Sequence, residues 1–298
     1  MPTGPYAEHA PARPLVVDLL LACHPEPTAV VTILTSLLAL RAGRGWGVGW
    51  MAAAVLAGQL AVGWTNDYVD RDLDQAAHRL DKPLARARAA GDGAGTSGLR
   101  PTTLRTAALA ALVASVPLSL ASGIGFTLAH LTAIAFAMAY NAGLKSTLLS
   151  FVPYTVAFGL LPTAVALSQP SPRWPAAWAP LAGALIGAGG HFTQALPDIP
   201  ADRRLGVLGL PQAIGQRASG VVAGLLLLGA NAAVALGPGS PGLIQLAGVA
   251  LAAVLAAGIV TAALSGRPKL SFRLTLAAAT GAVLAFLASG RGLGASPV

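Results

Sequence analysis

Charged residues are scarce in this chain. Asp, Glu, Lys and Arg make up 10% of its 298 residues, 55% of the residues are hydrophobic, and the mean hydropathy is +0.67. Soluble proteins carry about 25% charged residues, so the composition excludes an ordinary water-soluble domain and indicates an integral membrane protein. Cysteine is rarer still. Cys23 is the only one, which excludes internal disulfides and a cysteine-rich metal site.

Acidic residues are the scarcer of the two charge types: 11 Asp and Glu stand against 19 Lys and Arg, giving a formal net charge of +8. Nucleic-acid-binding proteins share such an excess, but they carry basic stripes interleaved with aromatic residues. The chain has no such stripe, so no nucleic-acid partner is expected. The positive charge is better explained by orientation in a lipid bilayer.

Apolar runs of membrane-spanning length follow one another along the chain. The first leads from residue 15 to about residue 40 and contains Pro25 and Pro27, which predict a kink or a separate interfacial segment. One all-α transmembrane domain of nine helices is therefore predicted over residues 15–290, between a flexible N-terminal tail (1–14) and a C-terminal tail (291–298). The eight further runs lie at about 46–66, 103–121, 124–142, 150–168, 174–196, 217–236, 242–264 and 271–288.

Basic residues fall unevenly on the two sides that nine spans define. With the N-terminus inside, the inner set holds fifteen of the 19, and the outer set holds only Arg41, Arg44, Arg173 and Arg291. Lys and Arg concentrate in cytoplasmic loops. The N-terminus and the long loop after the second span are therefore predicted to be cytoplasmic, in a multi-pass protein of the cell membrane.

The few acidic residues are clustered. Four of the 11 lie in N-D-Y-V-D-R-D-L-D, residues 66–74, at the end of a long apolar run. If this stretch is helical, Asn66 lies at the edge of an acidic face and Asp72 points away from it. Stacked carboxylates repel each other unless a cation lies among them, and oxygen ligands suit Mg²⁺ shared with substrate phosphates. A metal–diphosphate site is predicted, with a solvated helix end as the alternative. The carboxylates on that face are Asp67, Asp70 and Asp74.

A second acidic pair follows the sixth predicted helix. Asp198 and Asp202, in Q-A-L-P-D-I-P-A-D-R-R-L-G, are the only acidic residues after Asp92. The helix count places them on the same side of the membrane as Asp67. Pro200 prevents one continuous helix through the pair, so the two carboxylates are expected in a turn and at a following helix start. Two half-sites that together bind one diphosphate are predicted. Either Asp taken alone could instead be a structural residue of the turn that forms an ion pair with a neighbouring Arg.

The paired motifs, N-D-x-x-D-x-x-x-D on the second predicted helix and D-x-x-x-D after the sixth, resemble those of the UbiA-type family of intramembrane prenyltransferases. The resemblance covers almost the whole chain. It implies nine helices around a central cavity, with a cytoplasmic cap formed by the two Asp-bearing loops. It also implies that the matching residues bind Mg²⁺ and the diphosphate of an isoprenoid donor. Those residues are Asn66, Asp67, Asp70, Asp74, Asp198 and Asp202.

Basic and polar residues near the motifs are expected to contact the diphosphate. H-R-L-D-K-P-L (78–84) follows the first motif, at a shorter spacing than in the family and with Lys in place of Arg. Y-N-x-x-L-K (140–145) ends the fourth helix on the same side, where a Lys of the family contacts the diphosphate. Interfacial anchoring explains the tyrosine of this stretch equally well. The resemblance and spacing together give Arg79, Lys82, Tyr140, Asn141 and Lys145 as substrate-binding residues beside Asn66.

Loss of diphosphate from a prenyl donor leaves an allylic cation. Trp64, Tyr68 and Phe192 are expected to stabilise this cation through their aromatic faces. His191 and Gln194, just before the second motif, are candidates for the pocket wall, although a histidine in an apolar helix is more often a hydrogen-bonded packing residue.

The predicted function is Mg²⁺-dependent transfer of an isoprenoid group from a prenyl diphosphate to an acceptor, often an aromatic ring, within the membrane. Asp67, Asp70, Asp198 and Asp202 are the expected catalytic residues. The family resemblance also extends to membrane terpene cyclases, which use no acceptor, and the sequence does not separate the two. A cation-binding transporter is a third interpretation, but it predicts acidic residues near the middle of broken helices.

Overall fold

The structure is a computed structural model that describes residues 13–89, 99–289, 292–293 and 296–297. Most of the N-terminal tail predicted from the sequence therefore lies outside the described residues. The helices are α1 (Leu15–Ala22), α2 (Pro25–Arg41), η1 (Gly45–Gly47), α3 (Val48–Ala76), α4 (Pro83–Ala89), α5 (Pro101–Leu120), α6 (Ile124–Asn141), η2 (Leu144–Ser146), α7 (Val152–Leu167), α8 (Trp178–Ala195), α9 (Ile199–Arg204), α10 (Leu210–Leu236), α11 (Leu243–Leu264) and α12 (Pro268–Ala288), with strands β1 (Arg173–Trp174) and β2 (Ser296–Pro297).

Among the residues that the structure describes, six helices are long and apolar enough to cross a membrane: α3, α5, α6, α10, α11 and α12. α1 and α2 together form a seventh candidate, bent by 68°, and α7 is a shorter apolar helix. The protein is thus predominantly helical with several membrane spans, as the composition predicted. Each apolar run predicted from the sequence coincides with a helix, and α8 corresponds to the run at 174–196. The number of nine membrane spans stays a prediction.

The break between α1 and α2 lies at Pro25 and Pro27, where the sequence predicted a kink or a separate interfacial segment. Pro25 and Pro27 lie in the first turn of α2, where a missing backbone N–H costs nothing. The residue before them, His24, has a φ of 55°, which few residues other than glycine adopt. The strained turn directs the His24 side chain toward the carboxyl-terminal part of α3, where it contacts Asp67.

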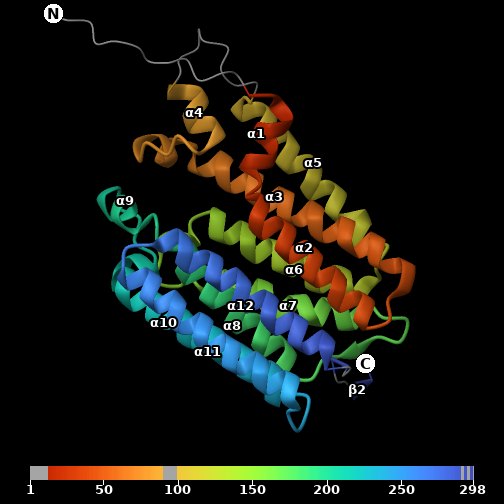
Figure 1. The fold of residues 1–298 in the computed structure, drawn as a ribbon. Helices are drawn as coiled ribbons and strands as arrows, with labels where there is room; N and C mark the ends of the chain where they lie inside the picture. The colour runs from red at the N-terminus through yellow and green to blue at the C-terminus, as the bar shows by residue number, and fades with distance from the viewer. Residues whose placement is uncertain (1–12, 90–98, 290–291, 294–295, 298) are drawn as a thin grey trace, which may run out of the picture.

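Neighbouring helices pack in a closed ring, in the order α2, α3, α6, α7, α8, α10, α11, α12 and back to α2, with α5 against α3 and α6. Figure 1 shows α9 at one end of this bundle and β2, near the C-terminus, at the opposite end. The loops that carry the acidic motifs therefore meet at one end of the ring. The other end carries the short antiparallel pairing of β1 with β2.

Small residues set the distance between α7 and α8. A methyl group added at Gly187 would overlap the backbone oxygen of Tyr154 and the side chain of Phe158, whereas one added at Gly190 would meet no atom within 4 Å. We therefore expect Gly187→Ala to destabilise the folded protein by about 1–3 kcal/mol through overpacking, and Gly190→Ala to leave its stability nearly unchanged. Thermal unfolding of the two variants in detergent tests this expectation, and equal unfolding temperatures would contradict it.

Candidate functional site

The ring of helices encloses a cavity of about 790 Å³. Its charged lining residues all lie at the end that carries α9 and the acidic motifs. Away from this end, the part of the wall that the structure describes is mostly apolar, with Thr35, Gln59 and His130 as polar exceptions. We call the charged end the mouth. The charged residues that line it are Asp70, Asp74, Arg79, Asp81, Lys82, Lys145, Asp198, Asp202 and Lys269.

The first acidic motif lies in the last turns of α3, which continues to Ala76, beyond the end of the apolar run. Asp70 and Asp74 line the cavity, as the shared helical face predicted. Asp72 points away: its side chain is 64% exposed and pairs with Arg88 at 2.7 Å. Two of the three carboxylates of the predicted face therefore line the cavity.

Asp67 differs from the other acidic residues of the motif because it lies behind the cavity wall and is only 2% exposed. Its Oδ1 atom is 2.5 Å from Nζ of Lys82 and 3.1 Å from Nε2 of His24, and these two nitrogens are 3.0 Å apart. Its Oδ2 atom is buried without a hydrogen-bond partner. Asp67 thus holds two residues of the mouth in place and retains one uncompensated oxygen.

Asp70 is the centre of a second group. Lys145, on η2, forms an ion pair with its Oδ1 atom, and the Asn66 amide donates to its Oδ2 atom at 3.0 Å. The same amide lies 3.1 Å from Oδ1 of Asn141, whose own amide donates to the carbonyl of Val62 at 3.1 Å. Residues that the sequence places 75 positions apart therefore meet at one point of the mouth.

Arg79 joins the two acidic motifs. Its NH1 atom is 3.2 Å from Oδ1 of Asp74 and 3.2 Å from Oδ2 of Asp198. The guanidinium neutralises two carboxylates that would otherwise repel each other across the mouth. The two motifs thus face one another, as two half-sites around one cavity would.

Asp198 and Asp202 lie at the start of α9, in the turn and helix start that Pro200 predicted. Asp198 is the N-cap residue, and Asp202 is in the first turn. Burial raises the pKa of Asp198 above the ordinary value of a carboxyl group, with Arg79 opposing the shift, and burial also raises the pKa of Asp202. Gln212 donates to Oδ2 of Asp202 at 2.7 Å and so connects α9 to the first turn of α10.

The aromatic residues expected to face the substrate were wrongly chosen. Trp64 packs against α1 and donates to the Leu19 carbonyl, Tyr68 lies under Arg71, and Phe192 belongs to an apolar core cluster. None of the three lines the cavity. Helical periodicity alone could not show which face of each helix turns inward. Within the described residues, the aromatic side chains that line the mouth region are Tyr140, Tyr154, Phe158 and Phe272.

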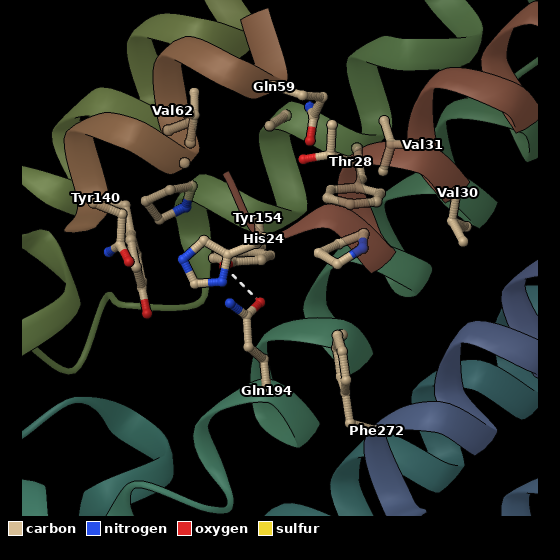
Figure 2. Close-up of a pocket in the computed structure, with 18 of the residues that line it drawn as sticks. His24, Thr28, Val30, Val31, Gln59, Val62, Tyr140, Tyr154, Gln194 and Phe272 are labelled. Carbon is tan, nitrogen blue, oxygen red and sulfur yellow. Dashed lines mark hydrogen bonds between the residues drawn. The ribbon is translucent and has the colours of Figure 1, made fainter. Parts of the chain in front are cut away.

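Of His191, Phe192 and Gln194, the candidates just before the second motif, only Gln194 lines the cavity. Its Oε1 atom accepts a hydrogen bond from the Tyr154 hydroxyl at 2.8 Å. Figure 2 shows Tyr140, Tyr154, Gln194, Phe272 and His24 around one space. They come from α6, α7, α8, α12 and the turn between α1 and α2. His191 lies behind this wall, and its Nε2 atom is 3.0 Å from Oγ of Ser150. It is therefore the hydrogen-bonded packing residue that the sequence offered as the alternative.

His24 is a mouth residue that was not predicted from the sequence. It lines the cavity and contacts both Asp67 and Lys82. The available signal was a histidine before a proline pair, in a turn ahead of an apolar run. Nothing in the local pattern places that turn beside residues 67 and 82. Gln212 was missed for the same reason.

The chemistry of the mouth suits a divalent cation that prefers oxygen. Five carboxylates lie at this end, and Asp67 has a buried oxygen without a partner. In the described part of the chain, however, no three His, Cys, Asp or Glu side chains converge closely enough to hold a metal. Lys82, Lys145 and Arg79 stand between the carboxylates instead. The oxygen donors fit Mg²⁺, provided that these cations move toward a bound diphosphate.

Comparisons with known proteins concern the overall fold and the family. No protein of curated function matches the sequence. In overall fold the chain is similar to an apo UbiA homologue from Aeropyrum pernix, with 20% identity, a TM-score of 0.70, and coverage of 89% of this chain and 98% of that one.

It is also similar to a UbiA homologue from Archaeoglobus fulgidus bound to GPP and Mg²⁺, with 15% identity, a TM-score of 0.62 and coverage of 90% and 99%. A structure described as digeranylgeranylglyceryl phosphate synthase gives 15% identity, a TM-score of 0.63 and coverage of 92% and 98%. A sequence profile described as the UbiA prenyltransferase family matches residues 29–273. The chain therefore belongs to the UbiA prenyltransferase family.

Proposed function

We propose that this protein transfers an isoprenoid group from a prenyl diphosphate to an acceptor, most plainly an aromatic ring, inside the membrane. The observation that carries the proposal is the mouth itself, where Arg79 bridges two acidic motifs at the charged end of a largely apolar cavity. A prenyl diphosphate has a charged head that suits the mouth and an apolar tail that suits the rest of the cavity. The Archaeoglobus fulgidus homologue bound to GPP and Mg²⁺ supports the same assignment.

The mouth residues would hold the diphosphate as leaving group. Lys82, Lys145 and Arg79 neutralise carboxylates in the structure and would exchange these partners for phosphate oxygens when the donor binds. Mg²⁺, held by Asp67, Asp70, Asp74, Asp198 and Asp202, would supply further positive charge at the leaving group when bound. Stabilising developing negative charge is usually the largest catalytic contribution, so these groups would lower the barrier to breaking the C1–O bond.

The cavity wall would protect the allylic cation. The electron pair of the C1–O bond would leave with the diphosphate, and the rings of Tyr140, Tyr154 and Phe158, which line the cavity, would stabilise the cation. Apolar walls keep water from capturing it. A carbon of the acceptor ring then bonds to C1, and the ring loses a proton.

We extend the proposal to the arrangement in the membrane. Nine spans, with α1 and α2 as one and with α7 and α8 each crossing, place the mouth on the same side as the N-terminus. The basic residues concentrate on that side, which by the positive-inside rule is the cytoplasm. The segments that follow α3 and α8 would then form a cytoplasmic cap over the diphosphate. Residues 15–290 would constitute the catalytic domain, with residues 1–14 and 291–298 as tails.

Cyclisation of the donor without an acceptor is the second candidate. It is favoured by the described cavity wall beyond the mouth, where no Asp, Glu, Lys or Arg side chain is present. In such a cavity a double bond of the donor itself could capture the cation.

The mass of the product separates the two candidates. Purified protein is incubated with Mg²⁺ and geranyl, farnesyl or geranylgeranyl diphosphate, with and without membrane extract as acceptor source. We expect a product that contains the isoprenoid plus an acceptor, formed only with extract and lost when the metal is chelated. A cyclic hydrocarbon or alcohol formed without extract would reject the transferase function in favour of the cyclase.

A further inference from the structure

The end of the cavity opposite the mouth is closed by three apolar residues, Trp178, Phe286 and Leu293, which we call the floor. All three line the cavity. The rings of Trp178 and Phe286 are in contact, with centroids 5.3 Å apart. Phe286 and Leu293 are 3% and 9% exposed. The floor therefore consists of packed side chains that belong to three separate segments of the chain.

The floor is held rigidly. Gly237, at the end of α10, is packed so closely against Trp178 that any side chain there would overlap the indole. The backbone N–H of Ala176 donates to the carbonyl of Leu293 at 3.1 Å, and β1 pairs with β2 just beyond. These contacts fix the indole from one side and the segment of Leu293 from the other. A substrate tail that reaches the floor would meet a wall that has little freedom to move.

The depth of the cavity follows from the helices that line it. On α12 the lining runs from Phe272 near the mouth to Phe286, fourteen residues later, which corresponds to about 21 Å at about 1.5 Å per residue. On α8 it runs from Gln194 to Trp178, sixteen residues, or about 24 Å. Each isoprene unit adds four carbon–carbon bonds of about 1.5 Å, which span about 5 Å when extended. Four units fill this depth.

We propose that the floor formed by Trp178, Phe286 and Leu293 sets the upper limit on the length of the donor's isoprenoid chain, and that this limit is the geranylgeranyl length. The inference rests on the proposed use of a prenyl diphosphate and adds the class of donor. A chain one unit longer has no space below the mouth unless it leaves sideways between helices.

The test uses two opposing variants in the full-length protein. Trp178→Leu opens the floor, and Ala282→Leu raises it, because Ala282 lines the cavity one helical turn above Phe286. The matched control is Trp174→Leu, which removes an exposed tryptophan of the same segment that does not line the cavity. Mg²⁺-dependent release of pyrophosphate is measured with geranyl, farnesyl, geranylgeranyl and geranylfarnesyl diphosphate in the presence of membrane extract.

We expect wild-type kcat/KM to remain high through geranylgeranyl and to fall at geranylfarnesyl diphosphate. Trp178→Leu should raise the ratio of kcat/KM for geranylfarnesyl over geranyl diphosphate at least about tenfold, the scale of discrimination that apolar pockets reach. Ala282→Leu should lower the ratio for geranylgeranyl over geranyl diphosphate by a similar factor, and the control should change neither. Geranyl diphosphate is too short to reach the floor, so its turnover reports correct folding of each variant.

The outcomes separate this inference from the proposed function. Unchanged length preference in both floor variants, with normal geranyl turnover, would overturn the role of the floor and indicate that long tails leave sideways. If Trp178→Leu loses geranyl turnover through misfolding, the chain-length preference of Ala282→Leu alone tests the role of the floor. A wild-type protein that releases no pyrophosphate from any donor would overturn the proposed function, and the floor hypothesis with it.

Discussion

Asp67→Asn is expected to lower Mg²⁺-dependent turnover of a prenyl diphosphate by about 10²–10³-fold or more, a loss typical of removing one preorganised electrostatic group. Asp67 is buried against Lys82 and His24 and keeps one oxygen without a partner. Asparagine preserves the size of the side chain but removes its charge, so Lys82 loses its counter-ion and the mouth loses a candidate metal ligand. Alanine is a poorer test, because it removes side-chain volume and the hydrogen-bonding group that faces His24 and Lys82 as well as the charge.

The matched control is Asp72→Asn. Asp72 lies in the same motif but is exposed, and its partners are Arg88 and Arg71 on the surface. Its loss should change turnover less than about twofold, since exposed ion pairs contribute about 0–1 kcal/mol. Turnover is compared at saturating Mg²⁺, with thermal unfolding in detergent to show that both variants remain folded. Full activity of Asp67→Asn would mean that the acidic motif has been assigned the wrong role.

Lys145→Gln is expected to lower kcat/KM for a prenyl diphosphate about a hundredfold, similar to the loss of one donor at a site of developing charge. Lys145 lines the mouth and pairs with Asp70, so it stands where a diphosphate would replace that carboxylate as its partner. Without the ammonium group, the leaving group loses a positive charge that acts in a partly buried site. Steady-state release of pyrophosphate measures the effect.

Lys145→Arg should recover part of the lost activity, because it restores the charge with a different geometry. Arg105→Gln is the control for overall charge: Arg105 is exposed on α5 and is not part of the cavity lining. An equal loss in Arg105→Gln and Lys145→Gln would show that the general positive charge of this face matters, and that no specific contact is made at residue 145.

Much of the mouth could be predicted because acidic residues are so rare in this chain. In a sequence with few charges, each Asp at the end of an apolar run needs an explanation. One shared site for a cation and a diphosphate was the prediction that accounted for Asp67, Asp70, Asp198 and Asp202 together. Periodicity also placed Asp72 off the acidic face, and Pro200 predicted the turn before α9. These features depend on local rules that hold whatever the neighbouring helices do.

The predictions that failed concern which side of a helix faces the cavity. Trp64, Tyr68 and Phe192 are aromatic and near the motifs, but each packs against a neighbouring helix or under a surface side chain. In a membrane protein the lipid-facing, core and cavity faces are all apolar, so the hydrophobic pattern does not distinguish them. Tyr154 and Phe158 could be assigned to the cavity only once α7 had been placed in the ring.

The sequence alone determined that the chain is a helical membrane protein with two acidic motifs suited to a cation and a diphosphate, because composition and short-range spacing are sufficient for both conclusions. Only the tertiary structure decided that His24 joins Asp67 and Lys82, that Arg79 bridges the motifs, and that Trp178, Phe286 and Leu293 close the cavity. These contacts join segments far apart in the chain, and their geometry depends on how the helices pack against one another.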